Sequence, residues 1–243
     1  MIDPGADVAA LRAARDRVLA EIARASAQVG RDPATVTLVA VSKTVPVERI
    51  RNALQAGFDL LGENRVQEAV AKAAELPDAR WHLVGPLQSN KARRAVETFE
   101  VIETVDSLAL AERLDRLAAE MRPGRQLPVL VQVNVDEDRA KAGIRPHEMD
   151  DALSAIGAFS GLEVRGLMTI GRLAATPDEA RATFRGLREL SERLTTEHAW
   201  LGPELSMGMT DDYPIAVEEG ATIVRVGRAI FGERPHHGES GGA

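Results

Sequence analysis

The chain has 243 residues, and its 44% hydrophobic content is enough for the core of one α/β domain or of two small ones. Its net charge of −7 argues against nucleic acid as the main partner, because a phosphate-binding surface normally carries a basic excess. The absence of cysteine excludes disulfides and thiolate zinc sites and fits a reducing cytoplasm.

The chain opens with a predicted amphipathic helix. Leu11, Val18 and Ile22 recur on one face before Gly30 ends the pattern. This start lacks the basic stretch and apolar run of an export signal, and nowhere do about 18 apolar residues follow one another. We therefore expect a cytoplasmic protein that is neither exported nor inserted into a membrane.

Eight short segments rich in β-branched residues follow, and helical patterns separate them. Several are almost continuously apolar, which is typical of parallel strands covered on both faces. A glycine-rich dinucleotide fingerprint does not follow residue 43, so a closed barrel is favoured over an open sheet. The predicted strands are 36–43, 60–64, 80–86, 101–106, 128–135, 162–170, 203–208 and 222–232.

These patterns predict an α/β fold, a single (β/α)8 TIM barrel with an extra N-terminal helix that could cover the bottom of the barrel. A proline- or serine-rich linker is lacking, so residues 1–232 are expected to form one domain. Residues 233–243 are small and polar and predict a flexible tail. Two adjacent histidines, His236 and His237, are too few for a metal site, and we expect none.

Lys43 closes the first predicted strand. Only four of the 30 basic residues are lysines, so a lysine at the end of an apolar run suggests a specific role for that residue. An ammonium is costly to desolvate and loses its proton more easily than a guanidinium. The residue either reaches solvent from the rim or is an amine that attacks an aldehyde to form a Schiff base.

Polar and sulfur-containing side chains stand near the ends of other strands, where the active site of such a barrel normally lies. Barrels often bind phosphate with the loops after strands seven and eight, and here those loops offer hydroxyl, glycine amide and arginine groups. The glycines could equally be turn residues. The candidate site residues are Lys43, Asn64, His82, Met168, Ser206, Gly208, Arg225, Gly227 and Arg228.

An aldehyde for Lys43 and a phosphate for Ser206, Gly227 and the Arg228 amide together suggest pyridoxal 5'-phosphate (PLP). Arg225 precedes Gly227 by two residues and would face the same side, toward the pyridine nitrogen. A guanidinium cannot accept a proton, so the ring would be a weak electron sink. Transaminase-like chemistry is therefore not expected.

Several motifs carry a resemblance to a known family. AVSKT (40–44), GENRVQE (62–68), WHLVGPLQSNK (81–91), GLMTI (166–170) and SMGMTDDYPIAVEEGATIVRVGRAIFG (206–232) closely resemble the YggS/PROSC family of pyridoxal phosphate homeostasis proteins. The resemblance implies a barrel of the alanine-racemase type that holds PLP as an aldimine on Lys43. It also implies that Asn64 lies near the phenolic side of the ring, and that His82 and Met168 line the pocket.

Three alternatives stay open beside these roles. His82 could be a packed histidine that donates to the main chain, Met168 could be apolar wall, and Lys91 of LQSNK has no derived task. Many relatives carry a small hydroxyl residue in place of Arg228, so a side-chain contact to phosphate could be lost, whereas Thr210 keeps the hydroxyl that serine supplies in relatives.

The resemblance also bears on whether the chain is an enzyme. Related racemases use a tyrosine from a second domain of the partner subunit, whereas this chain has one tyrosine, Tyr213, better suited to packing than to proton transfer. We expect a monomeric carrier that stores, buffers or delivers PLP, with PLP-dependent apoenzymes as candidate recipients. The rivals are a racemase or other Schiff-base barrel enzyme, and a sensor that acts on a protein partner.

Overall fold

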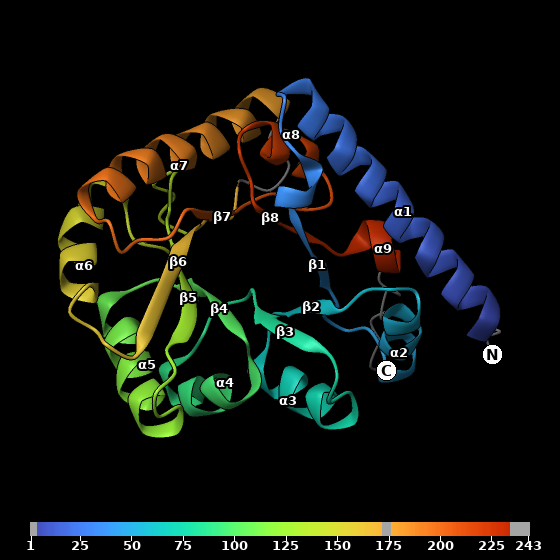
Figure 1. The fold of residues 1–243 in the computed structure, drawn as a ribbon, viewed down its shortest axis with the longest axis horizontal. Coiled ribbons are helices and arrows are strands. Elements are labelled where there is room, and N and C mark those ends of the chain that lie inside the picture. The colour runs from blue at the N-terminus through green and yellow to red at the C-terminus, as the bar shows by residue number, and fades with distance from the viewer. Residues whose placement is uncertain (1–3, 172–175, 234–243) are drawn as a thin grey trace, which may run out of the picture.

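The computed structural model describes residues 4–171 and 176–233. Eight parallel strands pair in chain order, and β1 pairs with β8, so the sheet closes into a barrel. Figure 1 shows the strands at the centre and the helices around them. The barrel predicted from the strand pattern is therefore confirmed. Whether residues 1–232 behave as one domain stays a prediction, and nearly all of the expected tail lies outside the described residues.

Each predicted strand overlaps an observed one, but every observed strand ends earlier than predicted, and β5 begins one residue earlier. The largest error concerns the predicted strand at 222–232, because only its first half is extended and its end turns into a short helix. Gly227 breaks the strand there and becomes the N-cap of that helix. The strands are β1 (Thr37–Val41), β2 (Leu60–Glu63), β3 (Arg80–Leu83), β4 (Val101–Val105), β5 (Leu127–Gln132), β6 (Leu162–Met168), β7 (Glu204–Ser206) and β8 (Ile223–Val226).

Helices follow the strands around the outside of the barrel. Amphipathic faces pack on the sheet, and local signals fix their ends: Ser107 caps one helix, and Thr176 with Glu179 forms a capping box on another. The helices are α1 (Pro4–Gln28), α2 (Val47–Gln55), α3 (Val66–Glu75), α4 (Ala92–Thr98), α5 (Leu108–Met121), α6 (Met149–Ile156), α7 (Pro177–Glu197), α8 (Tyr213–Glu218) and α9 (Arg228–Phe231), with short 3-10 turns at Pro33–Thr35, Ser89–Lys91 and Pro146–Glu148.

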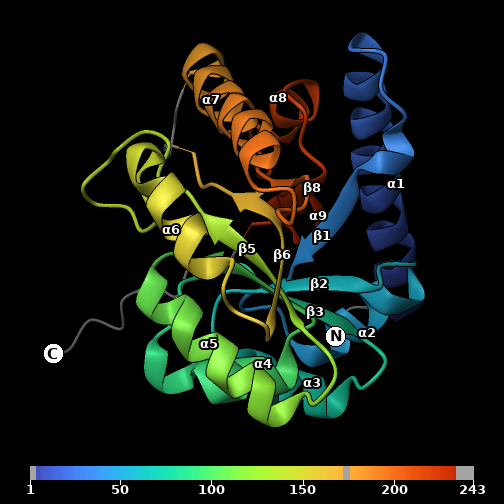
Figure 2. The same cartoon turned by 60° about the vertical axis from the view of Figure 1, so that its left-hand side comes forward.

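The first helix does not cover the bottom of the barrel, so that prediction was wrong. It packs along the side, against α2, α8 and α9, and Figures 1 and 2 show it beside these helices. The reason is geometric. The helices after β7 and β8 have only six and four residues, so they leave the outside of β8 and β1 poorly covered, and the 25-residue α1 buries its apolar face there.

The inside of the barrel changes character along its axis. An apolar group inside the barrel consists of Val39, Leu60, Val84, Leu130, Met168 and Ile223. Toward the C-terminal ends of the strands, the same inward-facing rows continue with charged and polar side chains, among them Glu103 and Arg225. Among the described residues, none of the helices has the length and apolarity needed to cross a membrane.

Candidate functional site

Lys43 lies in the turn that follows β1 and is half-buried. β1 turns Val39 and Val41 toward the barrel interior, and the same alternation favours an inward direction for Lys43. Val41 pairs with Gly62 of β2, so the Lys43 turn lies beside the end of β2, where Asn64 stands. The next residue, Thr44, has a φ of 64°, which is uncommon for a β-branched residue.

A buried ion cluster lies outside the barrel, directly behind this turn. The Lys72 ammonium on α3 is 2.6 Å from Glu63 Oε1, 2.7 Å from Glu68 Oε1 and 2.8 Å from the Ser42 carbonyl oxygen. The Ser42 hydroxyl also donates to Glu63 Oε1, at 2.8 Å. We call Lys72, Glu63, Glu68 and Ser42 the Lys72 cluster; it joins β2, α3 and the end of β1.

The two carboxylates of the Lys72 cluster differ in their pKa. Burial raises the pKa of Glu63, and the hydrogen bonds from Lys72 and Ser42 offset that rise only in part. Burial acts on Glu68 as well, but the hydrogen bonds from Lys72 and from the Thr44 N–H outweigh it and hold its pKa below the ordinary value. Glu68 is therefore the more firmly ionised partner of the lysine.

A second buried cluster lies inside the barrel. His82 Nδ1 is 2.6 Å from Glu103 Oε1, and the Ser206 hydroxyl donates to Glu103 Oε2, also at 2.6 Å. The Arg225 guanidinium donates to the Ser206 hydroxyl oxygen and, at 2.7 Å, to the Thr169 carbonyl. We call His82, Glu103, Ser206 and Arg225 the Glu103 cluster; it ties together β3, β4, β7 and β8.

Charge pairing within the Glu103 cluster keeps both of its charged groups ionised. Complete burial opposes the charge on Glu103, but the hydrogen bond from His82 and the charge of Arg225 outweigh it, so its pKa lies below the ordinary value. Burial lowers the pKa of Arg225, and the Glu103 charge opposes that effect. The guanidinium is thus held as a fixed cation inside the barrel.

The loops after β7 and β8 meet beside this cluster. Gly208 has a φ of 89°, and a Cβ at this position would lie 2.5 Å from the Cβ of Ala216, so the turn requires glycine. The Gly227 N–H donates to Thr210 Oγ1 at 3.3 Å, which brings a hydroxyl and a glycine amide together. Hydroxyl and main-chain N–H groups are donors that suit a phosphate.

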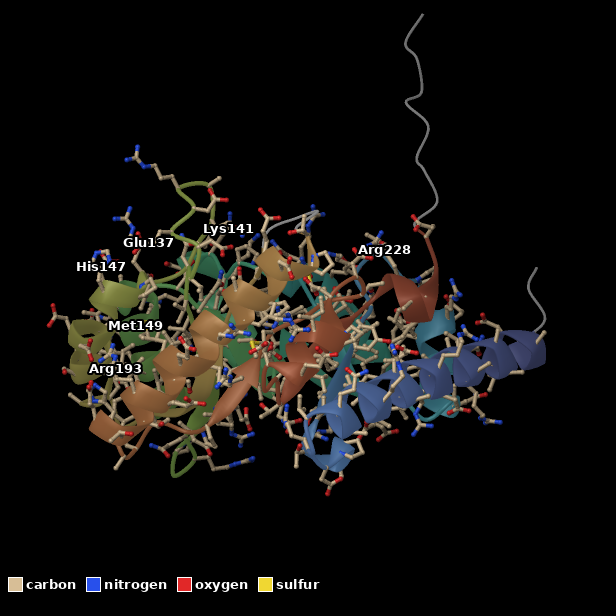
Figure 3. The ribbon with its side chains drawn as sticks, turned by 90° about the horizontal axis from the view of Figure 1, so that it is seen from above. Glu137, Lys141, His147, Met149, Arg193 and Arg228 are labelled. Atoms are coloured by element: carbon tan, nitrogen blue, oxygen red, sulfur yellow. The ribbon has the colours of Figure 1, made fainter. Side chains whose placement is uncertain are left out.

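Arg228 begins α9, and its side chain forms an ion pair with Asp211, which follows Thr210 in the loop after β7. Its side chain is half exposed. Figure 3 shows Arg228 on one side of the rim, far from Glu137 and Lys141, which lie on the loop after β5. The main-chain N–H of Arg228, in the first turn of α9, stays available as a donor.

The predicted site residues fall into four groups, of which Lys43 and Asn64 form the one beside the ends of β1 and β2. Ser206 and Arg225 meet inside the barrel with His82. Gly208, Gly227 and Arg228 lie in the loops after β7 and β8, and we call the Thr210 hydroxyl with the main-chain N–H groups of Gly227 and Arg228 the loop pair. Met168 belongs to the apolar group under them, as the apolar-wall reading requires. The Ser206 hydroxyl donates to Glu103, and its contact with a phosphate stays a prediction. Thr210 supplies the hydroxyl beside the Gly227 amide.

Asn64 opens onto a cleft of about 710 Å³ between the start of α3 and the loop after β3. Glu68 lines this cleft and accepts the Thr44 N–H, so the cleft adjoins the Lys43 turn. Gly85 lets the two loops approach, since a Cβ there would lie 2.5 Å from the Asn64 carbonyl oxygen. Lys91 also lines the cleft.

Sequence reasoning missed Glu63, Lys72, Glu103 and the position of Thr210 next to Gly227. One signal was present: Glu68 and Lys72 are four residues apart, the spacing of a helical ion pair. A charged residue in the middle of an apolar strand, such as Glu103 within VIETV, was another. Tyr213 is buried on α8 near Glu21 and Arg24 of α1, which agrees with packing rather than with a role in this site.

Comparison with known proteins identifies the class of barrel to which this chain belongs. Residues 15–235 match the family described as alanine racemase, N-terminal domain. An alanine racemase from Clostridium difficile superposes with a TM-score of 0.69 over 93% of this chain and 57% of that chain. Its identity of 16% shows a shared fold alone. The chain is a TIM barrel of the alanine-racemase type.

More similar relatives narrow the class. The pyridoxal phosphate homeostasis protein of Pseudomonas aeruginosa is 44% identical over 225 residues, 90% of this chain and 94% of the relative. That of Escherichia coli K12 is 39% identical over 89% of this chain and 93% of its own. The structure of PipY from Synechococcus elongatus PCC7942 with PLP bound is 47% identical, with a TM-score of 0.78 over 87% of this chain and 100% of that chain. The chain belongs to the pyridoxal phosphate homeostasis protein family, which confirms the resemblance seen in its motifs.

Proposed function

We propose that this protein binds PLP at the C-terminal end of its barrel and serves in PLP homeostasis, as its relatives are named to do. Lys43 holds the aldehyde of PLP as a Schiff base. The loop pair holds the phosphate, through Gly227, Thr210 and the Arg228 N–H. The observation that carries the proposal is the position of a half-buried lysine just after β1, beside the end of the neighbouring strand β8, where a hydroxyl and a main-chain amide lie together.

Arg225 is proposed to face the pyridine nitrogen from the Glu103 cluster. Its guanidinium stays charged and cannot accept a proton, so it leaves that nitrogen without one. Asn64 lies beside the Lys43 turn, on the side assigned to the phenolic oxygen, and Met168 closes the floor. PLP supplies an electrophilic carbonyl and a weak electron sink when it is bound in this way.

The proposed role is that of a carrier and not of a racemase. Proton transfer on both faces of a bound amino acid needs a second acid or base, and the tyrosine of this chain is packed against α1 instead. Relatives are named as homeostasis proteins, and none of those cited above that share 39% identity or more is named as an enzyme. Recipients of the PLP are proposed to be PLP-dependent apoenzymes.

The carrier is further proposed to act as a cytoplasmic monomer. Cysteine is absent from the sequence, which suits a reducing compartment. All of the proposed cofactor contacts come from one closed barrel, so the proposal needs no second copy of the chain. Sedimentation of the purified protein with and without PLP measures its mass directly.

Absorbance spectroscopy tests the proposal. Purified protein mixed with PLP is expected to show a near-visible band of a lysine-bound aldehyde, and Lys43→Ala is expected to remain folded and to lose it. Lys43→Arg is the matched control, because it keeps the charge but cannot form the imine. A band that survives in both variants would overturn the assignment. A protein-dependent, physiologically useful rate of alanine racemisation would favour the racemase alternative.

A further inference from the structure

The GENRVQE segment contributes more to the Lys43 turn than Asn64 alone. Its two carboxylates, Glu63 and Glu68, both contact Lys72, and neither belongs to the Glu103 cluster or to the loop pair. Lys72 is 5% exposed and Glu63 is fully buried. The proposed cofactor contacts give no reason for a buried lysine at this place.

The contacts of the Lys72 cluster bracket Lys43 on both sides. The Lys72 ammonium donates to the carbonyl oxygen of Ser42, which belongs to the peptide group before Lys43. Glu68 accepts from the N–H of Thr44, which belongs to the peptide group after Lys43. Both peptide groups that set the direction of the Lys43 side chain are therefore hydrogen-bonded to one pair of opposite charges.

The backbone at this point needs such support. Thr44 adopts a left-handed conformation that a β-branched residue seldom takes, and surrounding structure must hold it there. Two hydrogen bonds hold it there: the Thr44 N–H donates to Glu68 at 2.7 Å, and the Val45 N–H donates to the Ser42 carbonyl oxygen at 2.9 Å, and only the first comes from the Lys72 cluster. Released from the bond to Glu68, the turn is expected to relax toward an ordinary backbone conformation and to redirect Lys43.

Stability alone is a poor explanation for this cluster. Removing Lys72 and Glu63 from water is costly, and well-packed apolar side chains in place of a buried ion pair are often as stable or more so. A charged cluster does, however, fix directions, because ammonium and carboxylate groups form short hydrogen bonds at defined angles. The Lys72 cluster therefore serves to fix the positions of the main-chain groups that it contacts, rather than to raise stability.

We propose that Lys72, together with Glu63 and Glu68, is a positioning residue that fixes the backbone on either side of Lys43 and so aims the Lys43 amine at the aldehyde. This inference rests on the proposed function of Lys43. It assigns to Lys72 no contact with PLP. It gives the acidic residues of GENRVQE a role in the rate of capture.

The first experiment compares Lys72→Met with Arg122→Met, at saturating PLP. The readout is the rate at which borohydride fixes PLP onto Lys43, measured by peptide mass mapping. Lys72→Met is expected to slow labelling by about tenfold to a hundredfold, the effect of a small misplacement of a reacting group. Arg122 is a matched control: it is a partly buried cation that donates to the main-chain oxygens of Val96 and Phe99, at the opposite end of the barrel. Arg122→Met is expected to label like the wild type.

A second pair of variants, at Glu68, tests the same inference without relying on the folding of Lys72→Met. Glu68 is 24% exposed, so Glu68→Ala is tolerated more easily, and it takes away the acceptor of the Thr44 N–H. Glu68→Gln keeps an oxygen there. We expect Glu68→Ala to slow labelling by about tenfold and Glu68→Gln to restore it to within about threefold.

Wild-type labelling rates in folded Lys72→Met, or in Glu68→Ala if the former does not fold, would overturn the inference. The proposed function would survive that result, provided that Lys43→Ala still abolishes the label. If Lys43→Ala keeps the label, the proposed function fails instead. The same set of variants therefore distinguishes a failure of the Lys72 inference from a failure of the proposed function of Lys43.

Discussion

Two buried ion clusters stand near the C-terminal ends of the strands, and they face in opposite directions. The Glu103 cluster fills the inside of the barrel and points at the proposed cofactor, whereas the Lys72 cluster lies outside, between β2 and α3. The first joins side chains of four strands to one another, and the second joins side chains to the main chain beside Lys43.

This difference suggests that the two clusters at the same end of the barrel have different roles. The inward-facing charges are proposed to present a fixed group to PLP, and the outward-facing charges are proposed to shape the turn that carries Lys43. Variants in the Glu103 cluster should thus change stability and the electrostatics of the ring site together. Variants in the Lys72 cluster should act mainly through the position of Lys43.

The largest expected effect comes from Arg225→Met. It leaves Glu103 buried at the barrel centre without its guanidinium, and removing one partner of a buried pair typically costs about 3–5 kcal/mol. Urea unfolding of the ligand-free protein measures the change in unfolding free energy. A loss below about 1 kcal/mol would mean that the inside cluster does not hold its charges as described.

Glu103→Gln has the next largest expected effect, a fall of about 2 kcal/mol in the unfolding free energy. The substitution keeps the shape of the side chain but removes its charge. Glu103 has a folded pKa below its ordinary value of 4.5. Its stabilisation is therefore complete above that value and is lost as the pH falls through the lowered pKa. Unfolding free energies measured at falling pH should decline less steeply in Glu103→Gln than in the wild type, and equal slopes would contradict this assignment.

Gly85→Ala tests the turn beside the Lys72 cluster, and we expect it to lower the unfolding free energy by about 1–2 kcal/mol. The new Cβ would meet the Asn64 main chain, so the turn between β2 and α3 must shift. Because this turn leads into the Lys72 cluster, PLP binding should weaken in the same variant, as fluorescence titration would show. Gly124→Ala serves as a control, since a Cβ there has open space around it although its φ of 76° brings some strain.

The smallest expected effect is that of Arg228→Thr. The Arg228–Asp211 pair lies on the surface, and such pairs contribute about 0–1 kcal/mol. The main-chain N–H proposed to bind the phosphate is retained, so PLP affinity should change by less than about threefold, which corresponds to under 1 kcal/mol. A loss of affinity beyond tenfold would mean that the side chain itself reaches the phosphate.

Sequence reasoning located the eight strands and the rim residues because both follow from local patterns. Apolar β-branched runs indicate buried parallel strands, and residues near their C-terminal ends, such as Lys43 and Ser206, are expected at the same end of the closed barrel. The place of α1 could not be predicted, because it depends on how short the last two helices are. Glu103 was missed because its partners His82 and Ser206 come from other strands, and only the closed barrel brings them together. Lys72 has local partners in Glu63 and Glu68, but the local pattern does not show that the lysine is buried or that it also reaches the Ser42 carbonyl oxygen.

The most direct test of the central claim is borohydride reduction of the PLP-loaded wild-type protein, followed by peptide mass mapping. The label is expected on Lys43 at close to one equivalent per chain, with Lys72, Lys91 and Lys141 unlabelled. Label on another lysine, or a stable complex that borohydride does not fix to any lysine, would contradict the account.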